Sequence, residues 1–384
     1  MTVSDRLKPF GETIFAEISR LALQHEAINL GQGFPNWAGP DFVKDAAAAA
    51  MRDGCDQYAR TSGVPVLNEA IADHHARTGS RRPDPDREVT VTSGCTEAIA
   101  ATLIGLVNPG DEVVLFQPFY DSYRAAVAMA GAAPRFVTLR FPDFAVDPAE
   151  LRAAFSDRTR AILLNTPHNP TGKVFSAAEL ELVADCCRRH DAYAFSDEVY
   201  EHLVFDGAHR RIADLDGMAQ RTVTMSSLGK TFSLTGWKIG WTVAPPDLTA
   251  GVRAAHQFLT FATATPLQYG AAAALRAPDT YYAEFLADFR RKRDLLVDGL
   301  SRIGFTLRPP QGTYFVIADH TPFGFESDVA FCRHLVEDIG VAAIPPSVFY
   351  DDRAEGRPLV RFAFCKDDAT LREALRRLSR LVAR

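Results

Sequence analysis

The chain has 384 residues, of which 47% are hydrophobic and 23% charged, a composition typical of a globular protein with enough chain for two domains. The formal net charge of −6 argues against a nucleic-acid-binding protein, which needs a basic face to contact phosphates. Apolar runs fall short of membrane-spanning length and the N-terminus is mixed and polar, so we expect a cytoplasmic protein that does not enter a membrane.

The spacing of cysteines and histidines does not suggest a metal centre. The six cysteines include no CxxC pair, and the adjacent Cys186 and Cys187 are poorly placed for a disulfide or a zinc site. The motif HExxH is also absent. We therefore expect reduced thiols and no metal, and we interpret His74 and His75 as a solvated helix face.

The first helical pattern is the alanine run at 46–50, and from residue 88 onward short apolar runs alternate with longer helical patterns. We predict strands at 88–92, 112–116, 161–164, 192–196, 222–226 and 239–243, and helices at 95–107, 119–130 and 177–190. Ser176 and Glu179 form a capping box at the start of the last of these helices. Because strands that alternate with helices need crossover connections, we predict an α/β fold with a mostly parallel, doubly wound sheet covered on both faces.

After about residue 281 the pattern changes. We predict a long charged helix, strands at 314–317 and 360–364, and a closing helix at 371–384 with Leu371, Leu375, Leu378 and Val382 at helical spacing. These elements indicate a second, smaller α+β domain. We therefore expect a large domain at 45–280 and a small domain built from 1–44 and 281–384.

Polar residues follow the predicted strands of the large domain where each strand ends. In chain order they are Gly94, Cys95, Thr96, Tyr120, Asn169, Asp197, Tyr200, Ser227 and Lys230. Because ligands of doubly wound sheets bind at the carboxyl ends of the strands, we expect these residues to gather at one site.

The types of these residues indicate a cofactor. A small-residue turn that opens a helix at Gly94 offers N–H groups and a positive dipole end to a phosphate. Asp197 and Lys230 follow buried strands, where an unpaired charge is costly. Each residue alone could be a cap or an ion-pair partner, but five strand ends that converge on one edge favour a functional site. A lysine for a Schiff base, a carboxylate for a ring nitrogen and a phosphate cradle together match pyridoxal phosphate (PLP).

Six segments also carry a resemblance to a known family: 29–35 (NLGQGFP), 165–172 (NTPHNPTG), 196–200 (SDEVY), 226–241 (SSLGKTFSLTGWKIGW), 341–345 (VAAIP) and 360–366 (VRFAFCK). On them the chain resembles the PLP-dependent class I/II aminotransferases of fold type I, of the kynurenine, methionine and glutamine type. It is especially similar to actinobacterial proteins assigned as N-succinyl-diaminopimelate aminotransferases. The resemblance spans nearly the whole chain, and 226–241 is its most specific part.

The resemblance implies a role for each candidate residue. Lys230 would hold the cofactor and move the Cα proton of the substrate, while Asp197 would pair with the pyridine nitrogen. Asn169 and Tyr200 would hydrogen-bond the ring hydroxyl, and Tyr120 would stack on the ring. The phosphate site would be formed by the backbone of Gly94 and Cys95, by Thr96, Ser227 and Lys238, and by Tyr58 of the neighbouring subunit of a homodimer.

The same resemblance implies the substrate site. Arg361 would clamp the substrate carboxylate, and the alternation of residues 360–364 places this side chain opposite three apolar ones. Gly33 and Asn169 would line the pocket, Trp37 would contribute to its wall, and Thr96 would affect access for the substrate side chain.

Two other interpretations of Lys230 fail. Gly229, Lys230 and Thr231 resemble the end of a P-loop, but the glycine required five residues before Gly229 is Thr224. Ser227 and Lys230 match an SxxK motif, but the later Lys-Thr-Gly strand of penicillin-binding enzymes is absent.

We therefore predict an aminotransferase that moves the amino group of an L-amino acid to a 2-oxo acid such as 2-oxoglutarate by a ping-pong mechanism. Methionine, glutamine, kynurenine, an aromatic amino acid and N-succinyl-diaminopimelate all stay open as donors, in primary or secondary metabolism. The same residues also support a cysteine-S-conjugate β-lyase, because removal of the Cα proton can be followed by loss of a group from Cβ.

Overall fold

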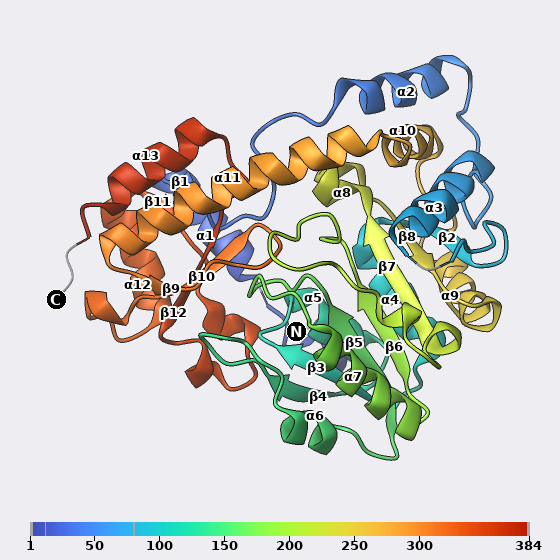
Figure 1. The fold of residues 1–384 in the computed structure, drawn as a ribbon, viewed down its shortest axis with the longest axis horizontal. Helices are drawn as coiled ribbons and strands as arrows, with labels where there is room; N and C mark the ends of the chain where they lie inside the picture. Colours follow the sequence, from blue (N-terminus) through green and yellow to red (C-terminus); the bar gives the residue numbers. More distant parts are fainter. Residues whose placement is uncertain (1–2, 12, 80, 382–384) are drawn as a thin grey trace.

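The computed structural model describes residues 3–11, 13–79 and 81–381. Its largest sheet has seven strands (Figure 1), which in spatial order are β2 (Val89–Ser93), β8 (Ile239–Val243), β7 (Thr222–Ser227), β6 (Tyr193–Asp197), β5 (Thr159–Asn165), β3 (Glu112–Gln117) and β4 (Ala133–Thr138). β8 runs antiparallel to both of its neighbours, and the other neighbouring strands pair in parallel. The predicted mostly parallel sheet is therefore confirmed.

Helices cover both faces of this sheet, as the alternation along β3 shows. Val113 and Leu115 pack with α4 (Gly94–Leu106), α5 (Asp121–Met129) and α9 (Pro246–Leu259). The intervening Val114 and Phe116 pack with α6 (Pro148–Ala154) and α7 (Ala177–Arg189) on the other face. At the β2–β8 end, α3 (Pro65–Thr78) and α10 (Thr265–Leu275) complete the cover, and α2 (Asp41–Arg52) packs on α10. The doubly wound arrangement is confirmed.

The rest of the chain forms a second group of elements around its own core. Its antiparallel sheet consists of β9 (Thr306–Leu307), β10 (Phe315–Asp319) and β12 (Leu359–Ala363). A short parallel pair, β1 (Ile28–Asn29) with β11 (Val341–Ala342), joins the N-terminal segment to the C-terminal part. The helices of this part are α1 (Ile14–Gln24), α12 (Asp328–His334) and α13 (Asp368–Leu378).

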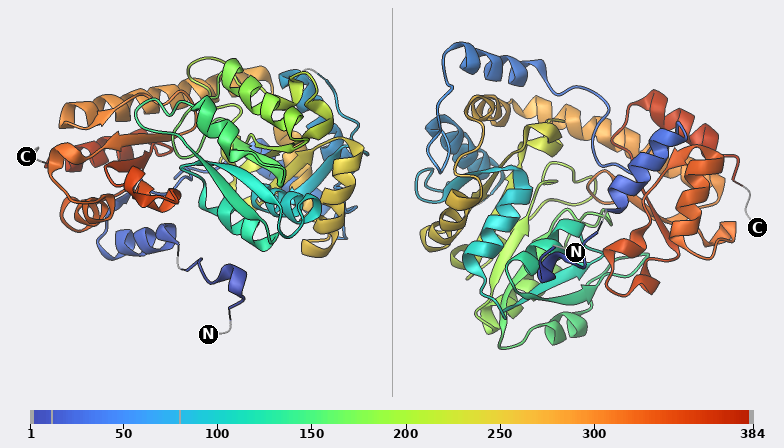
Figure 2. Two further views of the ribbon diagram at one scale, coloured as in Figure 1. Left: turned by 90° about the horizontal axis from the view of Figure 1, so that it is seen from below. Right: turned by 180° about the vertical axis from the view of Figure 1, so that it is seen from behind.

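The long helix α11 (Asp279–Ile303) runs from the region of α10 to that of α13 (Figure 1). Seen from behind, α1 lies among the C-terminal segments (Figure 2), in agreement with its contacts to β11. A second, smaller α+β part is thus present as expected, while its exact division from the large domain at residues 44 and 280 stays a prediction.

The six predicted strands and the predicted helices at 95–107, 119–130 and 177–190 lie within two residues of their observed bounds, and the capping box of Ser176 and Glu179 is present. The alanine run at 46–50 lies inside the longer helix α2. β4 is the strand of the large sheet that was not predicted: its first four residues are exposed or half-buried, so it lacks a strong apolar run. Bounds were not predicted for the helices α3, α6, α9 and α10 either. The closing helix ends at Leu378 rather than at residue 384, and Val382 lies outside the described residues.

All six cysteines are free. Within the described part of the chain, each helix is too short or too polar to cross a membrane.

Candidate active site

A cavity of about 440 Å³ lies where the parallel strands of the large sheet end. The predicted residues that line it are Gly33, Gly94, Cys95, Thr96, Tyr120, Asn169, Asp197, Tyr200, Ser227, Lys230, Lys238 and Arg361. The structure therefore brings together every predicted site residue except Trp37 and Tyr58.

One end of the cavity is the start of α4. Gly94 has a φ of +72°, and a Cβ atom there would lie 3.1 Å from Nζ of Lys238. The first-turn N–H groups of a helix have no partners within the helix, and Ser227 and Lys238 line the same cavity. Backbone N–H donors, a hydroxyl and an ammonium around one space fit a phosphate group.

Strand direction explains how Lys238 reaches this place. β8 is antiparallel to its neighbours, so its first residues lie at the edge where β7 ends. Gly240 then allows β8 to contact the start of α4, because a Cβ atom at Gly240 would lie 2.5 Å from the carbonyl carbon of Gly94. The sequence analysis missed Gly240, although it stands two residues after Lys238 in the most specific segment.

Asp197 and Lys230 stand at the ends of the neighbouring strands β6 and β7 and line the same cavity. Asp197 ends β6 and is only 4% exposed; burial raises the pKa of its carboxyl group. Lys230 lies on α8 (Leu228–Thr231), directly after β7, and burial lowers the pKa of its amine. A buried lysine whose pKa is lowered suits both covalent attachment of an aldehyde and proton transfer.

Arg361 also lines the cavity, and its residue is only 1% exposed. Its Nη1 donates to Oδ1 of Asn169 at 3.1 Å and its Nη2 to the carbonyl oxygen of Gly31 at 2.8 Å. The Nε atom is buried without a hydrogen-bond partner among the described residues. Burial lowers the pKa of this guanidinium to about 10, so it remains charged at neutral pH. A charged guanidinium that lines a cavity suits an incoming carboxylate.

Gly33 lies beside this arginine because no other residue fits. A Cβ atom at Gly33 would lie 2.6 Å from Cζ of Phe315, and the Gly33 carbonyl accepts a hydrogen bond from the Tyr314 hydroxyl at 2.5 Å. Phe315 in turn stacks on Arg361, with the guanidinium carbon 4.2 Å from the ring centroid.

Trp37 and Tyr58 lie elsewhere. Trp37 packs against Phe289, and Nζ of Lys292 is 4.0 Å from its ring, so Trp37 does not form the cavity wall that the resemblance implied. Tyr58 is 84% exposed and contacts Phe261 edge-on, outside the cavity of its own chain. Its role toward a neighbouring subunit stays a prediction.

The cavity also contains residues that the sequence analysis did not identify. They are Thr13, Phe15, Gln32, Ile99, Asp121, Tyr123, Asn165, Val199, Gly229, Thr235, Ile239 and Phe315. Tyr123 carried a usable signal, since it stands three residues after Tyr120 and therefore on the same helix face. Thr13 and Phe15 carried none, because only the fold brings the N-terminal segment to this site.

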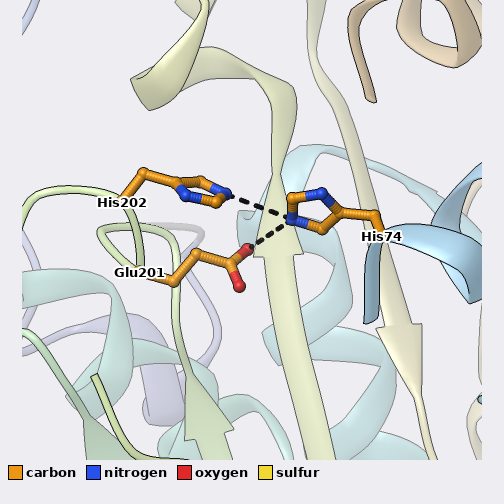
Figure 3. Close-up of side chains that lie close together, drawn as sticks. All are labelled: His74, Glu201 and His202. Atoms are coloured by element: carbon orange, nitrogen blue, oxygen red, sulfur yellow. Dashed lines mark hydrogen bonds and ion pairs between the residues drawn. The ribbon is translucent and has the colours of Figure 1, made fainter. Parts of the chain in front are cut away.

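The loop after Asp197 also contributes to a buried cluster. Nε2 of His74 is 3.1 Å from Nε2 of His202 and 3.5 Å from a carboxylate oxygen of Glu201 (Figure 3), an arrangement that could hold a metal ion. However, the Arg77 guanidinium lies 3.3 Å from Nδ1 of His74 and can only donate. Nδ1 therefore accepts and Nε2 carries the proton, which makes Nε2 a donor to its neighbours rather than a metal ligand.

A second grouping, of Glu198, Glu201 and His209, surrounds Arg211. This arginine donates to Glu198 at 3.1 Å and to Glu201 at 2.8 Å, so it supplies the positive charge that a cation would bring. We interpret both groupings as hydrogen-bonded networks that fix the 198–202 loop against α3. His74 is thus buried, as is its neighbour in sequence, and the predicted solvated helix face is wrong.

Comparisons with known proteins agree with this geometry. A model of the family "Aminotransferase class I and II" matches residues 25–378. The chain is 49% identical to a probable N-succinyldiaminopimelate aminotransferase of Mycobacterium tuberculosis over 100% of this chain and 99% of the relative. It is 42% identical to the methionine aminotransferase of Escherichia coli, over 98% of this chain and 97% of the relative. The solved structure of the Mycobacterium tuberculosis N-succinyldiaminopimelate aminotransferase superposes with a TM-score of 0.96 at 49% identity, with 100% of both chains covered.

The phosphate cradle, the buried lysine, the carboxylate opposite it and the arginine with an unused N–H together fit pyridoxal phosphate and an amino-acid substrate. The chain therefore belongs to the class I and II aminotransferases and is a pyridoxal-phosphate-dependent transaminase.

Proposed function

We propose that this enzyme transfers the amino group of an L-amino acid with a large, uncharged side chain to a 2-oxo acid such as 2-oxoglutarate. The observation that carries the proposal is the buried Arg361, whose Nε has no partner among the described residues and which shares one cavity with Lys230 and Asp197. Arg361 can therefore bind the carboxylate of a substrate in the same cavity in which Lys230 can accept a proton from it. We also propose a cytoplasmic location, which the free cysteines support.

The residues predicted from the sequence have the following parts in this proposal. Bound PLP supplies an electron sink for the Cα of the substrate. Lys230 accepts the Cα proton and returns it, while Asp197 keeps the ring nitrogen charged. Asn169 and Tyr200 would donate to the ring hydroxyl, and Tyr120 would cover one ring face. The phosphate is held by the first turn of α4, from Gly94 to Thr96, and by Ser227 and Lys238.

The lining of the cavity favours an uncharged donor side chain. Its cations among the described residues are Lys230, Lys238 and Arg361, and each already has a proposed partner. The remaining wall includes Phe15, Ile99 and Phe315, together with the carboxylate of Asp121. Apolar and aromatic walls suit donors such as methionine or kynurenine, while an additional carboxylate on the donor would meet Asp121 without a free cation in this chain.

N-succinyl-diaminopimelate is the second candidate donor, favoured by the relative at 49% identity. A donor screen against 2-oxoglutarate decides between the two. We expect methionine and kynurenine to give higher kcat/KM values than N-succinyl-diaminopimelate. A higher kcat/KM value for N-succinyl-diaminopimelate would contradict the proposal and identify it as the donor. Release of pyruvate and ammonia from a cysteine conjugate without any oxo acid would instead indicate β-lyase activity.

Arg361→Lys is expected to lower kcat/KM for every amino-acid donor by roughly 10- to 100-fold, mainly through KM, because an ammonium cannot replace two guanidinium hydrogen bonds to a carboxylate. The matched measurement uses an amino acid and the amine that lacks its carboxylate. The slow reaction of the amine should change little in the variant. Equal losses for both substrates would mean that Arg361 does not bind the carboxylate.

We also propose that the active unit is a homodimer in which Tyr58 reaches the phosphate site of the partner chain. An exposed aromatic surface supports this: Tyr58 is 84% exposed, Phe258 87%, and Phe261 43%. Tyr58 and Phe261 contact each other with ring centroids 5.2 Å apart. Large exposed aromatic side chains in one place indicate a surface that is covered by another protein chain.

Phe258→Asp tests the dimer, because a carboxylate at the centre of an apolar interface must be desolvated when the chains associate. We expect the variant to sediment with the mass of one chain and to lose transaminase activity. Leu23→Asp is the matched control, since Leu23 is 82% exposed on α1, outside the aromatic surface, and the change should leave the mass unaltered. A dimeric Phe258→Asp protein with normal activity would refute the proposed interface.

A further inference from the structure

The surroundings of Asp197 contain a residue with no assigned role. The hydroxyl of Tyr123 donates to Oδ2 of Asp197 at 2.7 Å, and the backbone N–H of Val199 donates to Oδ1 at 3.2 Å. The thiol of Cys95 also donates to this carboxylate. Asp197 is therefore held from both of its oxygens by neutral donors, of which Tyr123 makes the short hydrogen bond.

Burial favours the neutral form of Asp197, and these donors favour its ionised form. Burial alone raises the pKa of the carboxyl group, and the hydrogen bond from Tyr123 is the largest influence in the other direction. Lys230 is the cation that faces the same carboxylate. Burial also keeps the pKa of the Tyr123 hydroxyl well above its usual value, so this group remains a donor at neutral pH.

We propose that Tyr123 is the positioning residue that keeps Asp197 ionised and correctly oriented opposite the cofactor ring. The inference rests on the proposed role of Asp197. A carboxylate stabilised by a donor leaves the shared proton on the ring nitrogen. Without that donor the carboxylate becomes more basic and takes the proton, so the ring loses its positive charge.

The start of α5 positions both Tyr120 and Tyr123. Tyr120 precedes α5 and Tyr123 lies in its first turn, and their rings meet edge-on with centroids 5.5 Å apart. One helix start therefore places both the proposed stacking ring and the donor to Asp197. Tyr123 is itself buried, which fixes its hydroxyl in this orientation.

Tyr123→Phe removes the hydroxyl and keeps the ring, which makes it the direct test. A neutral ring repels a proton on the nitrogen that joins Lys230 to PLP less strongly than a charged ring does. The visible absorbance of the loaded protein should therefore titrate at a higher pH, by about one unit. The Kd for PLP should rise, and kcat should fall roughly tenfold with little change in KM.

Two further variants separate the possible outcomes. Tyr193→Phe removes another tyrosine hydroxyl, at the start of the same strand β6 but outside the cavity, and should titrate like the wild type. Asp197→Asn should shift the titration at least as far as Tyr123→Phe does. If Asp197→Asn shifts it and Tyr123→Phe leaves both the titration and the PLP Kd unchanged, the role of Tyr123 is refuted. If neither variant shifts the titration, the proposed role of Asp197 is itself refuted.

Discussion

Replacing Lys230 with alanine is expected to lower kcat/KM by at least about 10⁴-fold, the largest loss from any single substitution in this chain. The side chain has two parts in the proposed reaction, as the covalent anchor of the cofactor and as the group that moves the Cα proton. Burial lowers the pKa of its amine, which favours the neutral form that accepts a proton. No other lysine among the described residues of the cavity can replace it, because Lys238 faces the start of α4.

The expected loss can be assigned to Lys230 by a chemical measurement. Borohydride reduction of the loaded wild-type protein should leave PLP on the peptide that contains Lys230, as seen by mass spectrometry, and the variant should carry no adduct. Lys44→Ala is the matched control, since Lys44 lies on the exposed side of α2 in an ion pair with Asp41. An adduct on a different lysine in the wild type, or near-normal turnover of the variant, would contradict the assignment.

Much of this site was predictable because parallel strands place their carboxyl ends together. Once 192–196 and 222–226 were identified as strands of one parallel sheet, Asp197 and Lys230 had to lie at the same edge. A capping signal also located one helix of the large domain, because the capping box of Ser176 marks the start of α7.

The remainder depends on contacts that no local pattern encodes. Phe15 reaches the cavity only because β1 pairs with β11. Trp37 has the same aromatic character as a pocket residue, yet it covers Phe289 and Lys292 instead. His74 was misjudged because its helix is buried on more than one side, where polar residues form hydrogen bonds with the protein rather than with water.

Asp197→Ala is expected to give the second largest loss, roughly 10²- to 10³-fold in kcat, because a preorganised charge next to the reacting system is removed from a buried site. The change leaves the donor groups of Tyr123 and Val199 without their acceptor. The affinity for PLP should fall as well, since the ring nitrogen loses its partner. Steady-state kinetics at saturating PLP, together with a titration of PLP binding, separate the two effects.

The Asp197 carboxylate favours activity, but in the protein without cofactor it should lower the stability of the fold. Burial raises the pKa of Asp197, so the folded protein binds this proton more tightly than the unfolded chain does. Stability is therefore lost as the pH rises from the unfolded-state pKa to the folded-state pKa, and the loss is constant above both. Asp197→Asn without PLP should accordingly melt at a higher temperature than the wild type at neutral pH, and the difference should shrink in acid. A variant that is less stable without PLP and yet keeps near-normal turnover would show that this buried charge serves the fold rather than the cofactor.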